Sequence, residues 1–204
     1  MKIEGSATRE KRRYRMVARA DAAAATRRAI ADAWLALFSE LHYDEITLEV
    51  VAERAGVTVP TVIRHFGSKD ELFVAVARDV ADEEATRRAE TAVGDIPKAV
   101  RALVEHYERI GDVILRLLAQ EDRFAAMREV ADSGRRIHYE WVDRAFGPLL
   151  ESASGAERRY RRAEVVAVTD IYVWKVLRRD LGLGRGQVQT AIAEMVGALV
   201  DGGT

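Results

Sequence analysis

Apolar residues recur at helical spacing along most of this chain, and no segment shows the strict alternation of a half-buried strand. The clearest case begins at Ala22, where apolar residues spaced three and four apart predict a helix over residues 22–41. The apolar face of this helix consists of Ile30, Trp34, Leu37, Phe38 and Leu41. The pattern as a whole predicts an all-α fold.

Two shorter helices are expected next. The second helix begins after Thr47, whose hydroxyl can cap it, and ends at Gly56, because glycine tolerates the left-handed conformation of a helix stop. The third helix starts near Thr58, and Ser68 caps a fourth. The second and third helices are therefore two short units joined by a turn that contains glycine.

A boundary is predicted within "VGDIP", residues 93–97, where Pro97 suits the first turn of a new helix. The other helices are expected at about 69–92, 97–120, 122–133, 135–152, 157–181 and 185–201. We expect three regions along the chain: a basic flexible arm at 1–20, an N-terminal three-helix head at 21–68 and a C-terminal helical body at 69–204.

Charge is distributed unevenly along the chain. The 204 residues carry a formal net charge of −1, yet nine basic and three acidic residues leave +6 in the first 30 positions, and therefore −7 in the rest. A basic end on an acidic body favours a polyanionic partner at that end. A solubilising tail would have the same composition, so charge alone leaves both interpretations open.

Composition argues against several classes of protein. The chain has no cysteine, which excludes disulfides and thiolate metal sites and favours a reducing cytoplasm. No apolar run resembles a signal peptide, and none reaches the roughly 18 residues that a membrane helix needs. The four histidines show no clustered metal spacing, so we expect neither a metal site nor a cofactor.

The third helix has two chemically different faces. At about 100° per residue, four apolar residues fall on one side and are expected to face the core: Val59, Val62, Ile63 and Phe66. The opposite side presents a small surface made of Val57, Pro60, Thr61 and Arg64, flanked by Thr58 and His65. Packing against a core does not account for this second surface.

The outward face of the third helix has chemistry suited to reading bases. Pro60 is tolerated in a first turn and offers a compact apolar surface to a thymine methyl group. Thr61 can bond a base edge or a phosphate, and Arg64 can form two hydrogen bonds with guanine. The two short helices fit a helix-turn-helix whose second helix enters the major groove. An ordinary corner between packed helices is the alternative.

The segment "TLEVVAERAGVTVPTVIRHFGSKDELFVAV" resembles the DNA-binding region of the tetracycline-repressor (TetR) family. The shared features are a capped short helix, the pattern A-x-x-A-G-V, a recognition helix that ends in His-Phe, and a following S-K-x-x-L. The likeness covers about residues 45–76, and the helix at 22–41 fits the first helix of the family. The second half of the chain resembles the family in its layout of long helices only.

The resemblance implies roles for seven residues between Thr47 and Lys69. Thr47 becomes a capping residue on the phosphate side. The recognition-helix contacts become Thr58, Pro60, Thr61 and Arg64, and the phosphate contacts become His65 and Lys69. Ile63 departs from the family, which usually has a phosphate-binding tyrosine there. A basic arm could replace that phosphate contact; its residues are Lys11, Arg12, Arg13 and Arg15.

The resemblance also implies a homodimer and a ligand pocket. The last two helices would pack against their symmetry copies, through a stripe of Val188, Ala191, Ile192, Met195 and Leu199. A monomer that covers this stripe with its own helices is the alternative. The pocket would take a hydrophobic or aromatic effector, and the candidate lining residues are Tyr107, Phe124, Met127, Trp141 and Trp174. Aromatic residues at helical spacing also simply fill cores.

We therefore expect a cytoplasmic, ligand-responsive transcriptional regulator, most simply a repressor. It would bind a pseudo-palindromic operator in double-stranded DNA as a homodimer, and a small-molecule effector would release it. One alternative is a protein with this fold that has lost operator binding and acts through protein interactions. An enzyme is a weaker alternative, because the sequence has no nucleophile–base signature, no HExxH and no paired-carboxylate motif.

Overall fold

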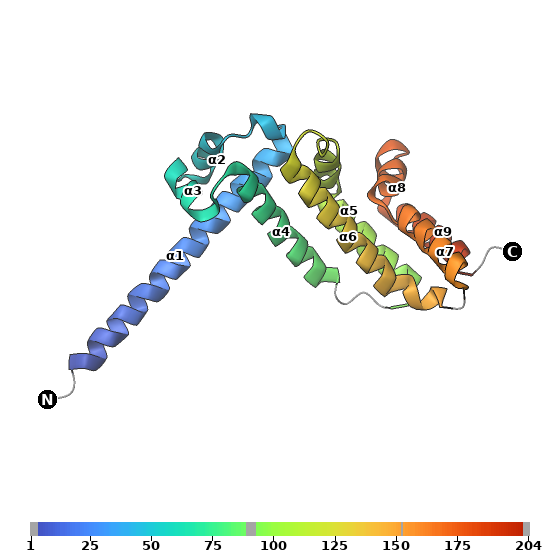
Figure 1. Ribbon diagram of the computed structural model, residues 1–204, viewed down its shortest axis with the longest axis horizontal. Coiled ribbons are helices and arrows are strands. Elements are labelled where there is room, and N and C mark those ends of the chain that lie inside the picture. Colours follow the sequence, from blue (N-terminus) through green and yellow to red (C-terminus); the bar gives the residue numbers. More distant parts are fainter. Residues whose placement is uncertain (1–3, 89–92, 152, 202–204) are drawn as a thin grey trace. The chain divides into compact units, whose positions relative to one another are not determined.

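The computed structural model describes residues 4–88, 93–151 and 153–201, with side chains described from residue 16 onward except at 87 and 88. Helices are the regular elements throughout these ranges, and no strand occurs in them (Figure 1). The helices of the first half are α1 Glu4–Glu40, η1 Tyr43–Glu45, α2 Leu48–Ala55, α3 Val59–Phe66 and α4 Lys69–Arg88. Those of the second half are α5 Ile96–Leu118, α6 Ala125–Phe146, η2 Gly147–Leu150, α7 Gly155–Val168, α8 Ile171–Lys175, η3 Val176–Asp180 and α9 Arg185–Val200. The predicted all-α class is confirmed.

The chain divides into two compact units, Met1–Val76 and Ala77–Thr204, which we call the head and the body. The division falls inside α4, whereas the sequence placed it after residue 68. The reason is that the first two turns of α4 bury apolar side chains in the head, namely Leu72, Phe73 and Val76.

An aromatic cluster fills the core of the head. The ring of Phe73 lies 5.6 Å from Phe38, 5.9 Å from Trp34 and 5.5 Å from Tyr43, measured between centroids. The apolar face predicted for α1 supplies much of this core, since Ile30, Trp34, Leu37 and Phe38 are all buried. Burying such large side chains stabilises the head by about 1.5–3 kcal/mol each.

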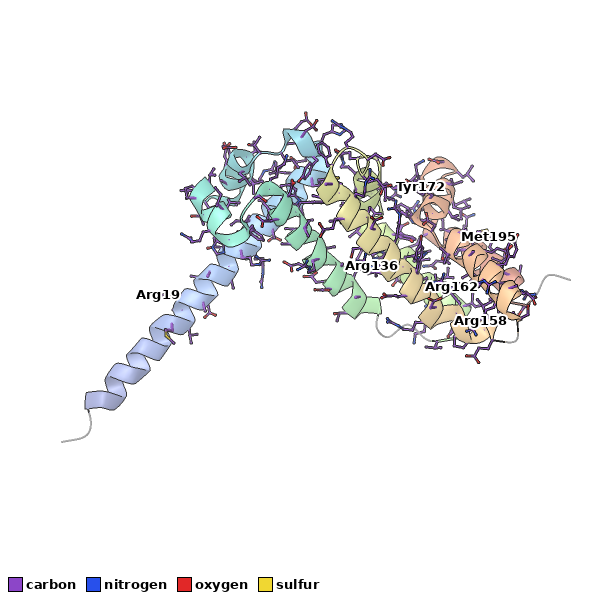
Figure 2. The ribbon with its side chains drawn as sticks, viewed as in Figure 1. Arg19, Arg136, Arg158, Arg162, Tyr172 and Met195 are labelled. Atoms are coloured by element: carbon purple, nitrogen blue, oxygen red, sulfur yellow. The ribbon has the colours of Figure 1, made fainter. Side chains whose placement is uncertain are left out.

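The start of α1 differs from the prediction. The helix begins at Glu4 rather than Ala22, so residues 4–20 are helical instead of forming a loose arm. This segment lacks proline and is rich in arginine, lysine, glutamate and alanine, which are strong helix formers. Arg19 is exposed on this part of α1 (Figure 2). Four basic side chains of the expected arm lie outside the described ones: Lys11, Arg12, Arg13 and Arg15.

The body packs α5 to α9 around one apolar core, and α5 and α9 are in extensive contact. One helix, α6, replaces the two that were expected over residues 122–152. The predicted break fell at Gly134, but this glycine is exposed and an added side chain would meet open space. A glycine there costs the helix about 1 kcal/mol, which the packing of α6 outweighs.

The single helix expected over residues 157–181 is interrupted at Thr169. A new helix, α8, begins there because Asp170 caps it by accepting a hydrogen bond from the backbone N–H of Tyr172 at 2.9 Å. On the other side of the break, the Tyr107 hydroxyl donates to the Thr169 carbonyl at 3.0 Å. A π-helical turn, η3, then ends the segment. None of the described helices combines the length and apolar character needed to cross a membrane.

Candidate nucleic-acid interface

The turn between α2 and α3 is fixed at both of its ends. Thr47 caps α2, since its hydroxyl accepts from the backbone N–H of Val50 at 3.4 Å. Gly56 ends α2 at a φ of 65°, in the left-handed region that favours glycine. The N–H of Val57 returns to the carbonyl of Ala52 at 2.9 Å, which completes the helix stop. The sequence predicted both the cap and the stop.

Helix α3 is anchored in the head by two side chains. Val62 is 1% exposed and Phe66 is 9% exposed, and they lie one turn apart on the same side of the helix. Arg27 of α1 reinforces this anchor, because its guanidinium lies 4.2 Å above the Phe66 ring and donates to the carbonyl of His65 at 3.4 Å. Sequence reasoning missed Arg27, whose role depends on a contact 38 residues along the chain.

The side of α3 that faces away from this anchor carries the residues expected to contact DNA. Thr58, Pro60 and Arg64 are exposed, while Thr61 and His65 are half-buried. The hydroxyls of Thr58 and Thr61 lie 3.0 Å apart, within hydrogen-bonding distance of each other. Pro60 lies in the first turn, where its missing N–H leaves no helical hydrogen bond unmade. The arrangement holds a short polar and apolar surface on a rigid helix.

The position predicted for Ile63 on α3 was wrong. We expected it in the buried stripe, but it is 49% exposed. The buried stripe is narrow because α3 has only eight residues and inserts two of them, Val62 and Phe66, into the head. Ile63 follows Val62 by about 100° around the helix, so it lies on the flank of that stripe and outside the core.

Lys69 has structural partners in the head. Its ammonium donates to the carbonyl of Tyr43 at 2.9 Å and lies 4.2 Å above the Tyr43 ring. The Tyr43 hydroxyl in turn donates to Asp70, and burial together with this hydrogen bond raises the pKa of Tyr43. Lys69 thus ties the start of α4 to η1. The proposed phosphate contact would add to this role.

In the body, a buried carboxylate joins the second half of α4 to α5. The side chain of Glu84 is 10% exposed and accepts hydrogen bonds from His106 Nδ1 at 2.9 Å and from Arg109 at 2.5 and 3.1 Å. Burial alone would raise the pKa of Glu84, but the hydrogen bonds from Arg109 and His106 outweigh it and lower the pKa to about 2. No periodic pattern in the sequence predicted this cluster.

The proposed ligand-binding residues are only partly brought together. Tyr107, Trp141 and Trp174 belong to one buried cluster, in which the rings of Tyr107 and Trp174 lie 5.9 Å apart. The indole N–H of Trp174 donates to Glu108 at 3.1 Å. Met127 is buried and Phe124 is half-buried at the start of α6, but neither belongs to that cluster of described residues.

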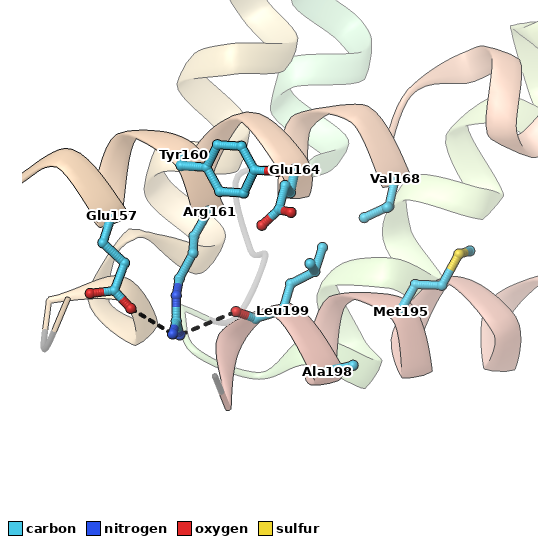
Figure 3. Close-up of a pocket in the computed structure, with 8 residues that line it drawn as sticks. All are labelled: Glu157, Tyr160, Arg161, Glu164, Val168, Met195, Ala198 and Leu199. Carbon is cyan, nitrogen blue, oxygen red and sulfur yellow. Dashed lines mark hydrogen bonds and ion pairs between the residues drawn. The ribbon is translucent and has the colours of Figure 1, made fainter. Parts of the chain in front are cut away.

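An open groove of about 570 Å³ lies between α7 and α9 (Figure 3). Its lining residues are Glu157, Tyr160, Arg161, Glu164, Val168, Met195, Ala198 and Leu199. Arg161 crosses one end, where it pairs with Glu157 at 2.7 Å and donates to the Leu199 carbonyl at 3.4 Å. None of the five proposed ligand residues lines this groove.

The stripe expected for dimerisation on α9 has two parts. Val188 and Ile192 are fully buried in the body's own core. Met195 and Leu199 instead line the groove, where they remain half-buried. The wheel grouped all of these residues because it could not show which neighbouring helix each one faces.

Comparison with known proteins places this architecture in a family. Residues 30–76 match bacterial regulatory proteins of the tetR family. The transcriptional repressor LfrR of Mycolicibacterium smegmatis is 32% identical over 139 residues, which cover 66% of this chain and 72% of that protein. The repressor KstR of the same organism is 26% identical over 177 residues, which cover 84% of this chain and 87% of KstR.

The fold resembles those of solved transcriptional regulators. A transcriptional regulator from Rhodococcus sp. Rha1 matches 86% of this chain and 96% of its own, with a TM-score of 0.67 at 18% identity. At that identity the likeness shows the fold alone, whereas LfrR carries the family relation through sequence. The chain therefore belongs to the TetR family, and it is a helix-turn-helix transcriptional regulator of the repressor type rather than an enzyme.

Proposed function

We propose that this chain is a ligand-responsive, cytoplasmic repressor that binds a pseudo-palindromic DNA operator as a homodimer and is released by a small hydrophobic or aromatic effector. The observation that carries the proposal is the outward face of α3. Pro60 and Arg64 are exposed there, with Thr61 beside them, while Val62 and Phe66 hold the opposite side in the head. Each group on that face suits a base edge or a phosphate.

The contacts around α3 support a preorganised reading surface. Arg27 covers Phe66, and Lys69 ties η1 to the start of α4, so both ends of the helix-turn-helix are braced. A rigid helix enters the major groove without first losing conformational freedom. Two copies would place their α3 helices in successive major grooves, about 34–36 Å apart.

The groove between α7 and α9 supports the dimer. Val168, Met195 and Leu199 give it an apolar floor, and Tyr160 beside them is 68% exposed. A second copy related by a two-fold axis would cover the same residues on both chains. The charged residues at the rim, such as Glu164, would then lie at the edge of the interface, where charges are usual.

The aromatic cluster of the body supports an effector site. Tyr107 and Trp174 pack against each other, and Trp141 belongs to the same buried cluster. The Tyr107 hydroxyl together with Thr169 adds polar groups to this apolar region. An aromatic ligand with a hydrogen-bonding group would have to part these side chains, and so would shift the helices that carry them. A coupling free energy of about 1–3 kcal/mol between effector binding and DNA binding would lower the affinity for DNA 5–150-fold.

Selection from random duplex DNA tests the proposal. The purified protein is incubated with the duplexes at low salt, where phosphate contacts are strongest, and the retained duplexes are sequenced. The expected result is a motif with two-fold symmetry. The selection is repeated after unfolding and refolding, which strips any ligand carried through purification. Absence of enrichment in both experiments would instead favour a protein that has kept the fold and lost operator binding.

A further inference from the structure

The exposed face of α3 contains an apolar side chain without a role in the core. Within residues 47–69, all of which the structure describes, Ile63 is the one large apolar residue that is exposed. It lies one turn after Pro60, which is also exposed, and residues three apart on a helix have Cβ atoms about 5–6 Å apart. Ile63 and Pro60 therefore form a small apolar strip along the flank of the recognition helix.

A single exposed isoleucine is ordinary on a protein surface, so its neighbours decide the interpretation. Arg64 follows it directly and is exposed, and His65 comes next. A basic setting of this kind favours a polyanion over an apolar protein partner. Ile63 itself can neither donate nor accept a hydrogen bond, so it cannot contact a phosphate or the polar edge of a base.

The major groove displays one apolar group at the base edges, the 5-methyl group of thymine. We propose that Ile63, together with Pro60, packs against a thymine methyl group in each operator half-site, and that this apolar contact sets the base preference at that position. The inference rests on the proposed function, because it concerns the DNA-reading face of α3. It replaces the phosphate contact of the usual tyrosine with a contact that carries sequence information.

Replacing thymine by uracil tests this contact, because the exchange removes the methyl group and keeps every hydrogen-bonding group of the base. Each thymine of the selected operator is replaced in turn, symmetrically in both half-sites, and Kd is measured by fluorescence anisotropy at fixed salt. Loss of one buried methyl group weakens binding about fourfold, and loss of two about fifteenfold. We expect a loss of this size at one symmetric pair of positions.

The variants Ile63→Ala and Arg64→Ala show which side chain reads the methyl group. In Ile63→Ala, the ratio of Kd for the uracil operator to Kd for the thymine operator at that position is expected to fall to about twofold or less, since the apolar partner is gone. We call this ratio the thymine–uracil ratio. In Arg64→Ala the overall affinity falls but the ratio at that position is retained. Circular dichroism serves as the control for folding, and both variants are expected to fold because both positions are exposed.

A third variant, Ile63→Tyr, is expected to exchange the contact with the thymine methyl group for a contact with a phosphate. A tyrosine hydroxyl can reach a phosphate, so this variant is expected to lose the thymine–uracil difference and to depend more steeply on salt, by about one phosphate contact per half-site. An unchanged salt slope together with a retained thymine–uracil difference would overturn the inference.

The outcomes separate this inference from the proposed function. If the protein binds the operator equally well with thymine and with uracil at every position, the inference is overturned, but the proposed repressor function is unaffected. A thymine–uracil ratio that persists in Ile63→Ala overturns it as well, because another group then reads the methyl. Failure of the wild-type protein to enrich any duplex overturns the proposed function and this inference with it.

Discussion

Glu84 links the second half of α4 to α5 within the body. Its carboxylate is nearly enclosed, yet it accepts three hydrogen bonds from His106 and Arg109 of α5. Removing one partner of such a buried ion pair strongly destabilises the fold, because the remaining charge stays buried and unpaired. The second half of α4 therefore depends on this cluster for its position on α5.

The lowered pKa of Glu84 predicts a dependence of stability on pH. Its pKa in the folded protein is about 2, below the ordinary value of 4.5, so its contribution is complete above pH 4.5 and is lost as pH falls toward 2. Glu84→Gln is expected to lower the free energy of unfolding by about 2–3 kcal/mol at pH 7 and to flatten this acid dependence. Denaturant unfolding at several pH values measures both.

Glu83→Gln is the matched control, because Glu83 is the exposed neighbour of Glu84 on the same helix. It should change neither the stability at pH 7 nor the acid dependence by a measurable amount. Equal behaviour of the two variants would show that the Glu84 cluster does not hold α4.

At this scale the sequence predicted what depends on local pattern and missed what depends on distant contacts. The caps at Thr47 and Gly56 follow from local chemistry, and the wheel placed Pro60 and Arg64 on the outer face. The wheel failed at Ile63, because it cannot show how wide a stripe the neighbouring helices cover. It was also silent on Glu84, whose partners come from another helix.

At the scale of elements, close packing and ion pairs join α5 to the segment α8–η3 in the body. Trp174 of α8 is fully buried and packs closely over Gly111 of α5, where an added Cβ would lie 2.7 Å from two of its ring carbons. Ion pairs fix the same segment on α5, from Arg178 to Glu108 at 2.8 Å and from Arg179 to Asp112 at 2.9 Å. These contacts hold the π-helical turn in place.

Substitution of Gly111 tests this packing, and substitution of Gly134, which has no such contact, is expected to change stability in the opposite direction. Gly111→Ala should lower the free energy of unfolding by about 1–3 kcal/mol, because the methyl group collides with a ring that cannot move freely. Gly134→Ala, in the exposed interior of α6 with open space around it, should raise stability by about 0.5–1 kcal/mol. Thermal unfolding measures both, and stabilisation by Gly111→Ala would contradict the close contact.

The helix boundaries show the same division between local and distant causes. The cap at Asp170 is a local signal that could have been read, but the break at Thr169 also relies on the Tyr107 hydroxyl, 62 residues away. The continuation of α6 through Gly134 could not be predicted either, because glycine weakens a helix by an amount that packing readily outweighs. Long, strongly periodic segments were predicted well, and their interruptions were not.

At the scale of the whole molecule, the proposed function requires two chains. One helix-turn-helix reads one half-site, so a symmetric operator implies a symmetric protein. The groove between α7 and α9 is the surface we assign to that symmetry, and Leu199 lies between Arg161 and Met195 along it in Figure 3. The sequence predicted that α9 would contribute, but it could not separate the residues of α9 that face the groove from those in the body's core.

A charge placed in the groove is expected to separate the chains. Met195→Glu would bury a carboxylate against apolar side chains of the second copy, so sedimentation should show the 22.7 kDa monomer where the wild type shows a dimer. Val93→Glu, at an exposed apolar position between α4 and α5, should leave the dimer intact. A wild-type monomer, or a dimer that survives Met195→Glu, would contradict this assignment of the groove.

The central claim is that the outward face of α3 reads the operator, and repeating the DNA selection with Arg64→Ala tests it most directly. Arg64 is exposed and can bond guanine through two hydrogen bonds, so its loss should cost about 1–3 kcal/mol. The selected motif should lose its preference at one symmetric pair of positions and keep the others. An unchanged motif bound with unchanged affinity would contradict the claim.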